Sequence, residues 1–135
     1  MKKGLPVVAV DFDNTLFMDA YPFVGEVIEG AVEVINSLYN KGWTIIINTC
    51  REGEMAENAI LALEEHGFKY SFFNNNDPVR TAKYGYDSRK IGSDLIIDNA
   101  ALPLALTGID WEVIEEMMGD FEDIWTANQS IYESK

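Results

Sequence analysis

Acidic side chains stand at the ends of two short apolar runs in this sequence. Asp11 and Asp13 follow the run at residues 6–10, and Asp98 closes the run DLIID at residues 94–98. Carboxylates that share one crevice repel each other unless a cation binds among them, and oxygen ligands of this kind suit Mg²⁺. The residue types therefore predict a magnesium site that could also take part in phosphoryl transfer.

Phosphoryl transfer could use each of these groups. Asp11 can attack phosphorus and form an aspartyl-phosphate, which divides a difficult hydrolysis into two easier steps. Asp13 can protonate the leaving alcohol and then deprotonate the attacking water. Mg²⁺, the Thr49 hydroxyl and the Lys90 ammonium would stabilise the charge on the phosphoryl oxygens.

The predicted strands show how residues so far apart in the sequence could meet. Four runs have the composition of strands: residues 6–10, 43–48, 70–73 and 94–98. Continuous apolar runs rich in β-branched residues are typical of strands that are buried on both faces of a parallel sheet.

Apolar residues recur at helical spacing in three other segments, which are residues 29–41, 51–68 and 111–125. Gly119 is expected to interrupt the third helix. Residues 17–23 lack a clean periodicity and are expected to form an irregular loop or a small hairpin.

Strands that alternate with helices predict βαβ units, right-handed crossovers and a parallel sheet. The carboxyl ends of all strands lie on one edge of such a sheet, so Asp11, Thr49 and Asp98 are expected to converge there. The length favours a single α/β domain over residues 1–135.

The formal net charge of -13 makes most of the surface repel polyanions and anionic membranes. Long nucleic acids are therefore disfavoured as partners. Basic residues gather in one short stretch, at Arg80, Lys83, Arg89 and Lys90, and Arg51 follows another predicted strand. A small positive region in an acidic protein predicts the capture of a small anion.

Cys50 is the single cysteine, so no internal disulfide can form, which fits a reducing cytosol. We expect it to be a buried small hydrophobe beside the predicted site. The apolar run near the start is too short for a signal peptide, and no run is long enough to span a bilayer. These features predict a cytoplasmic protein with no membrane partner.

The motifs resemble, in their order along the chain, those of the haloacid dehalogenase (HAD) superfamily of phosphohydrolases. The resemblance is carried by DFDNTL at residues 11–16, IINT at residues 46–49, Lys90, and LIIDN at residues 95–99. It implies a Rossmann-like three-layer sandwich with a central parallel sheet.

The resemblance also implies a role for each motif residue. Asp11 would be the nucleophile, and Asp13 the general acid and base. Thr49 and Lys90 would hold the phosphate. Mg²⁺ would bind to Asp11, Asp98 and the backbone carbonyl of Asp13.

One position departs from the family pattern. Many members end the last motif in two acids, whereas this chain has Asp98 followed by Asn99. The Asn99 amide is expected either to orient a water on the metal or to cap the following turn. Weaker Mg²⁺ binding is the expected consequence of the missing acid.

The sequence contains further candidates for residues that bind the phosphate. Thr15 and Arg51 are further candidates beside Thr49 and Lys90. Arg51 either contacts the phosphate or pairs with a neighbouring glutamate on the helix surface. Lys83 is the rival of Lys90 as the phosphate-binding lysine.

The intervals before and after Thr49 leave no room for the cap domains that this family inserts there. We therefore expect an open site without a cap domain, whose specificity comes from nearby loops or from a neighbouring subunit. YP at residues 21–22, REGE at residues 51–54 and GIDW at residues 108–111 resemble small capless bacterial or phage members of the family with poorly defined substrates.

Two other classes of protein fit part of this pattern. A receiver-type signalling domain would carry its phosphoacceptor at the end of the third strand, where this sequence has Phe73 and Asn74. A catalytically silent HAD-like phosphate-binding protein is suggested by Asn99. If the protein is an enzyme, we expect a small phosphorylated substrate. The apolar face of residues 111–125 is expected to cover the core, and the alternative is that it forms the contact surface of a homo-oligomer.

Overall fold

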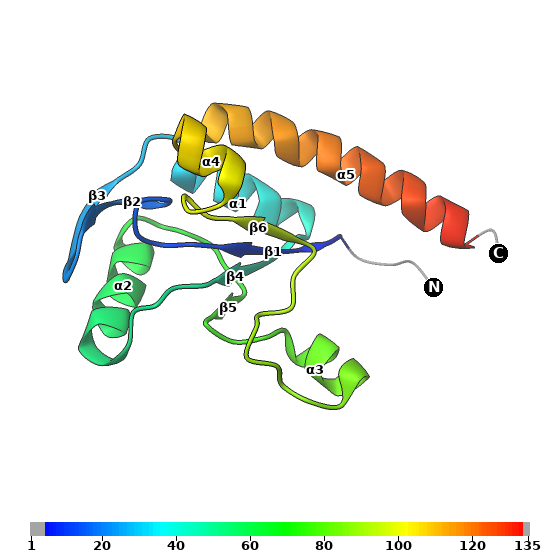
Figure 1. Cartoon of the computed structure of the whole chain (residues 1–135), viewed down its shortest axis with the longest axis horizontal. Helices are drawn as coiled ribbons and strands as arrows, with labels where there is room; N and C mark the ends of the chain where they lie inside the picture. Colours follow the sequence, from blue (N-terminus) through cyan, green and yellow to red (C-terminus); the bar gives the residue numbers. More distant parts are fainter. Residues whose placement is uncertain (1–4, 134–135) are drawn as a thin grey trace.

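Four parallel strands form the central sheet of the computed structural model, which describes residues 5–133. β1 (Val7–Val10) pairs with β4 (Thr44–Ile47) on one side and with β6 (Leu95–Ile97) on the other. β5 (Phe72–Phe73) pairs with β4, so the strand order is β5-β4-β1-β6 (Figure 1). The predicted α/β class, with a central parallel sheet flanked by helices, is confirmed.

All four predicted strands are present, and the third is the shortest. Regular pairing begins only at Phe72, because the Ile45 N–H donates to the Ser71 hydroxyl oxygen at 3.0 Å rather than to a backbone carbonyl. β1 is buried along its whole length, as expected of a central strand covered on both faces.

The order of the strands reverses at β1. The chain runs from β1 outward through β4 to β5 and then returns to β6 on the other side of β1. Ligands of open α/β sheets bind beyond the carboxyl ends of the strands at such a reversal of order. Asp11 is the first residue after β1 and therefore lies at this position.

An antiparallel hairpin leaves the main sheet directly after β1. It consists of β2 (Phe17–Ala20) and β3 (Phe23–Val27), so the hairpin alternative for this segment is confirmed. Phe17 anchors its base in the core, whereas Tyr21 and Phe23 at its tip are 60% and 75% exposed. The Tyr21–Pro22 peptide bond is cis.

Five helices complete the described part of the chain: α1 (Ala31–Lys41), α2 (Gly53–Glu65), α3 (Pro78–Tyr84), α4 (Leu102–Thr107) and α5 (Trp111–Glu133). α1 packs against β4 and α5, and α2 packs against β3 (Figure 1). The core gathers apolar residues of β1, β4, α1 and α5 with aromatic residues of the β1–β2 segment. No helix in residues 5–133 is both long and apolar enough to cross a membrane.

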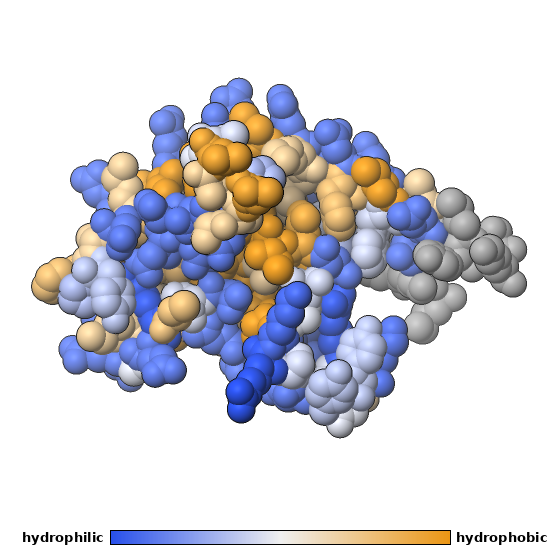
Figure 2. All heavy atoms as spheres, viewed as in Figure 1, coloured by the Kyte–Doolittle hydropathy of each residue, from blue (hydrophilic) through white to orange (hydrophobic). Residues whose placement is uncertain are grey.

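Two helices differ from the prediction. α5 runs through Gly119 without interruption, because one glycine costs a helix only about 1 kcal/mol and the flanking apolar face packs on the core. α4 was not predicted, because its residues LPLALT are nearly all apolar and show no helical alternation of apolar and polar faces. Leu102 and Leu106 are 76% and 81% exposed, and apolar surface gathers over this helix (Figure 2). Trp111, Ile114 and Met118 of α5 are buried, which confirms their expected packing as core cover.

Candidate active site

Asp11 lies at the carboxyl end of β1, where its backbone N–H donates to the Ile97 carbonyl of β6 at 2.9 Å. Burial raises the pKa of Asp11 to about 6, and the negative charge of Asp98 adds to this effect. Hydrogen bonds from the Phe12 N–H and the Thr15 hydroxyl act in the opposite direction. Asp11 is therefore a partly desolvated carboxylate with a second acid nearby.

Thr15 is fully buried and forms a hydrogen bond with Asp11. Its hydroxyl donates to Asp11 Oδ2 at 3.2 Å and accepts from the Asn99 N–H at 3.1 Å. Its carbonyl accepts from the indole Nε1 of Trp111 at 2.9 Å. Thr15 thus orients the acid instead of facing a phosphate as predicted, and Trp111 is a supporting residue that sequence reasoning placed only in the core.

Asn99 approaches the same carboxylate from the end of β6. Its amide is assigned with Nδ2 donating to Asp11 Oδ2 at 2.8 Å and to the Asp13 carbonyl at 3.3 Å, because the opposite orientation would set oxygen against oxygen. Asp98 closes a turn by accepting the Ala100 N–H at 2.8 Å. The amide of Asn99 therefore bonds to the nucleophile candidate itself and does not merely cap the turn.

The oxygen atoms around Asp11 match the preferences of Mg²⁺. They are the carboxylates of Asp11 and Asp98 and the carbonyl of Asp13, and Mg²⁺ commonly uses one or two carboxylates with water and phosphate oxygens. Burial of Asp11 and the nearby charge of Asp98 raise the pKa of Asp11 to about 6, so a cation bound between these acids would favour the ionised form. No cluster of three or more His, Cys, Asp or Glu side chains suited to a metal occurs within residues 5–133, so a site here depends on the carbonyl and on exogenous oxygens.

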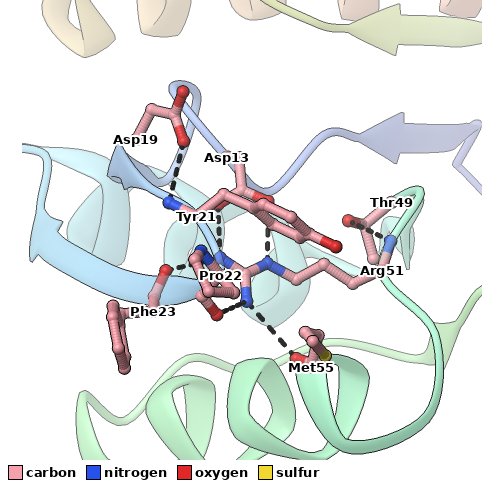
Figure 3. A network of polar contacts seen from close by, with 8 residues as sticks. All are labelled: Asp13, Asp19, Tyr21, Pro22, Phe23, Thr49, Arg51 and Met55. Carbon is pink, nitrogen blue, oxygen red and sulfur yellow. Dashed lines mark hydrogen bonds and ion pairs between the residues drawn. The ribbon is translucent and has the colours of Figure 1, made fainter.

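Asp13 forms a two-pronged ion pair with Arg51 (Figure 3). Arg51 Nε donates to Asp13 Oδ2 at 2.8 Å, and Nη2 donates to Oδ1 at 2.7 Å. The side chain of Asp13 is 24% exposed, whereas that of Arg51 is 1% exposed. The hydrogen bonds that Arg51 donates to Asp13 raise the pKa of Arg51 above its ordinary value.

The remaining N–H groups of Arg51 bind backbone carbonyls. Nη1 donates to Pro22 O at 3.1 Å and to Met55 O at 3.4 Å, and Nη2 donates to Phe23 O at 2.7 Å. All five N–H groups of the guanidinium are therefore engaged. In this arrangement Arg51 has no donor left for the predicted phosphate contact, and its acidic partner is Asp13 rather than a neighbouring glutamate.

Thr49 follows β4, on the side of β1 opposite to β6. Its N–H donates to Asn74 Oδ1 at 2.8 Å, and its hydroxyl oxygen accepts the Arg51 N–H at 3.2 Å. A hydroxyl that accepts one bond still has its own proton to donate, so Thr49 can contact a phosphate oxygen. Asn74, which follows β5 with a φ of 54°, is a supporting residue that sequence reasoning assigned only to a turn.

The two candidate lysines lie outside this cluster. Lys90 is exposed on the loop after α3, where its carbonyl accepts the Ser88 hydroxyl at 2.6 Å. Lys83 on α3 places its ammonium 5.6 Å from the ring centre of Tyr84. Within the described residues, neither ammonium forms an ion pair with Asp11 or Asp98, so the structure does not bring a lysine to the nucleophile candidate.

Cys50 lies between Thr49 and Arg51, and its side chain is exposed. The expectation of a buried small hydrophobe is therefore wrong. The turn that follows β4 directs the next side chain, that of Arg51, into the interior, and Cys50 faces solvent instead.

Comparison with known proteins identifies one relative. The sequence matches no known family description and no curated protein. It is similar to a solved structure, that of a conserved protein from Bacteroides thetaiotaomicron, with 33% sequence identity and a TM-score of 0.74. The match covers 86% of this chain and 91% of that chain. This chain belongs to the same family as the conserved Bacteroides thetaiotaomicron protein.

Proposed function

We propose that this protein is a Mg²⁺-dependent phosphohydrolase of the HAD type, which hydrolyses small phosphate monoesters through an aspartyl-phosphate on Asp11. The observation that carries the proposal is the setting of Asp11. It stands at the carboxyl end of the central strand, at the reversal of strand order, with Asp98 near its carboxylate and two donors on one of its oxygens. This is the arrangement that covalent phosphoryl transfer to a carboxylate requires.

The hydrogen bonds of Asp11 favour attack by one particular oxygen. Thr15 and Asn99 both donate to Oδ2, which holds the side chain in one rotamer. We assign the attack on phosphorus to Oδ1. With a pKa of about 6, Asp11 is ionised and nucleophilic at neutral pH.

The phosphate would rest between the ends of β1 and β4. The Thr49 hydroxyl would donate to a phosphoryl oxygen, and the ammonium of Lys90, with Lys83 as the alternative, would have to move in from its exposed position to bind the phosphate. Asp11, Asp98 and the Asp13 carbonyl would hold Mg²⁺, which supplies positive charge to the phosphoryl oxygens when bound. Asp13 donates a proton to the leaving oxygen and later accepts one from water.

The proposed architecture is a Rossmann-like HAD domain without a cap. The interval between Asp11 and Thr49 holds the β2–β3 hairpin and α1, and the interval after Thr49 holds α2, β5 and α3. The hairpin is then the structural element best placed to shape an otherwise open site. The acidic surface favours a small phosphorylated substrate over a long nucleic acid.

A second candidate is a catalytically silent phosphate-binding protein of the same type. Two observations favour it: Arg51 engages both carboxylate oxygens of Asp13, and the Asn99 amide occupies Asp11 Oδ2. A receiver-type domain has less support, because β5, the third strand of the main sheet along the chain, ends at Phe73 without a following acid.

Turnover separates these candidates. The wild-type protein is assayed with a panel of phosphorylated metabolites and with 4-nitrophenyl phosphate, with Mg²⁺ and with EDTA. Phosphate release that requires Mg²⁺ and is lost in Asp11→Asn supports the enzyme. Asp120→Asn, at an exposed acid on α5, is the matched control and keeps full activity.

The covalent intermediate gives a second readout. Mass spectrometry after a rapid acid quench detects a phosphoryl group on a peptide that contains Asp11. Labelling without release of phosphate indicates the binding or signalling alternative. Absence of both labelling and release across the panel contradicts the proposed function.

A further inference from the structure

One buried arginine joins the segment after β1, the hairpin turn and the start of α2. Arg51 binds Asp13 after β1, the Pro22 and Phe23 carbonyls at the hairpin turn, and the Met55 carbonyl at the start of α2 (Figure 3). It is one of two buried polar or charged side chains in the described core. Removing a charged side chain from water costs free energy, so a buried arginine with a full set of hydrogen-bond partners suggests a specific role.

We propose that Arg51 is a positioning residue, which holds the Asp13 carboxylate for proton transfer and makes its placement depend on the position of the β2–β3 hairpin. The catalytic part of this inference rests on the proposed function, because it takes Asp13 as the acid and base. The mechanical part, the coupling of hairpin and carboxylate through Arg51, rests on the geometry alone.

The guanidinium fixes both the position and the plane of the Asp13 carboxylate. Two parallel N–H···O bonds match the fork of arginine to the two carboxylate oxygens, and lysine cannot reproduce that match. The guanidinium carbon also lies 5.3 Å from the ring centre of Phe12 and 5.2 Å from that of Tyr21. Because one ring after β1 and one ring at the hairpin turn lie against the guanidinium, the arginine has little freedom to turn away.

One nitrogen atom of Arg51 contacts both the Asp13 carboxylate and the hairpin. Arg51 Nη2 donates to Asp13 Oδ1 and to Phe23 O, both at 2.7 Å. The tip of the hairpin is largely exposed, and the bonds from Arg51 to the Pro22 and Phe23 carbonyls connect this tip to the site. A displacement of the hairpin therefore pulls on the guanidinium and, through it, on the carboxylate.

The proton transfers balance without a change at Arg51. Asp13 enters the first step carrying on one oxygen the proton that it took from water in the preceding turnover, and gives this proton to the leaving alcohol oxygen as the bond between that oxygen and phosphorus breaks. In the second step the Asp13 carboxylate takes a proton from water as the water oxygen bonds to phosphorus and the Asp11–phosphorus bond breaks. The guanidinium keeps all its protons and orients the group that moves them.

The kinetic test compares two leaving groups. Phenyl phosphate needs a proton on its leaving oxygen, whereas 4-nitrophenyl phosphate depends on it far less. Arg51→Lys is expected to lower kcat/KM for phenyl phosphate at least about tenfold, within the range of general acid catalysis, and for 4-nitrophenyl phosphate by less than about threefold. Equal losses with both substrates would indicate a merely structural role and overturn the positioning role.

A double-mutant comparison checks that Arg51 acts through Asp13. In an Asp13→Asn background, Arg51→Lys is expected to cause no further loss of kcat/KM for phenyl phosphate. Losses that multiply in the double variant contradict the inference. Glu52→Gln, at an exposed neighbour of Arg51, is the matched control and leaves kcat/KM unchanged for both phenyl phosphate and 4-nitrophenyl phosphate.

Hydrogen exchange tests the coupling without any assay of activity. Asp13→Asn weakens the hold on Arg51, so we expect faster exchange of amides in residues 17–27 and unchanged exchange in β1 and β4. Arg51→Lys gives the same pattern. Unchanged hairpin exchange in Asp13→Asn overturns the coupling even in an active enzyme.

Failure of the proposed function has a different signature. A wild-type protein that releases no phosphate from any substrate removes the catalytic part of the inference together with the function. Hairpin exchange that still responds to Asp13→Asn would then support the coupling itself. The two failures are therefore distinguishable in the same set of variants.

Discussion

Asn99 Nδ2 lies 2.8 Å from Asp11 Oδ2, so an amide donor bonds directly to the carboxylate that we assign as the nucleophile. The same nitrogen lies 3.3 Å from the Asp13 carbonyl, which is another oxygen of the proposed Mg²⁺ site. The donor therefore competes with a cation for two of the oxygens that a cation would use. Where many members of the HAD family have a second acid, this chain therefore has an amide that donates to Asp11 and to the Asp13 carbonyl.

Asn99→Asp is expected to strengthen Mg²⁺ binding. The substitution removes the competing donor and adds a carboxylate, and changes of this kind beside a metal alter affinity by about tenfold or more. Isothermal titration with Mg²⁺ measures the dissociation constant. Asn99→Ala, which removes the donor without adding charge, separates the two contributions, and an unchanged affinity in Asn99→Asp contradicts a metal site at Asp11.

Asp11→Asn is expected to stabilise the metal-free protein at neutral pH. The pKa of Asp11 is raised from 3.8 to about 6, so the folded protein binds this proton more tightly than the unfolded chain. Stability is consequently lost as the pH rises from about 4 to about 6, and the full penalty applies above that range. Asp11→Asn should raise the free energy of unfolding at pH 7.5 by about 1 kcal/mol, after allowance for solvent screening of a partly exposed group.

Urea unfolding in EDTA at pH 7.5 and at pH 4 measures this difference. The gain should be much smaller at pH 4, where Asp11 of the folded wild-type protein is protonated. A gain of the same size at both pH values would show that the charge of Asp11 is not its cause.

Thr15→Val is expected to destabilise the protein. Valine has a similar shape but leaves the partly buried Asn99 N–H without its acceptor, which is 3.1 Å away in the wild type. An unsatisfied buried donor costs about 1–3 kcal/mol. Thr15→Ser keeps the hydroxyl and serves as the control, and a loss in Thr15→Ser as large as that in Thr15→Val would point to packing instead.

Gly25→Ala is expected to disrupt the hairpin and lower activity with little effect on the core. A Cβ at Gly25 would lie 2.1 Å from the Met18 carbonyl oxygen, so the backbone of β2 or β3 must move. Such a movement displaces the carbonyls that bind Arg51. Circular dichroism, urea unfolding and kcat/KM for phenyl phosphate are measured together.

Gly119→Ala is the matched control for Gly25→Ala. No atom lies within 4 Å of a Cβ built at Gly119, which sits inside α5. Alanine there should stabilise the protein by about 0.5–1 kcal/mol, because it lowers the conformational entropy of the unfolded chain. Wild-type activity in Gly25→Ala would show that the hairpin has no part in the site.

Local patterns were sufficient to predict the strand that presents Asp11. The run before Asp11 is apolar at successive positions, which suits a central strand whatever the partners are, and the residue after such a strand must lie at the edge of the sheet. The same logic placed Thr49 after β4 and Asp98 after β6. α4 escaped prediction because it buries no side chain and leaves no periodic signal.

The sequence by itself therefore determined which residues follow the strands, and hence the composition of the candidate site. Only the tertiary structure decided which of them touch. Arg51 pairs with Asp13 across 38 positions, and Thr15 meets Asn99 across 84, so no local pattern links them. The physical reason is that donors are assigned by distance and by competition: the Asp13 carboxylate and three backbone carbonyls occupy every N–H of Arg51, a result that follows from the fold and not from the spacing of residues.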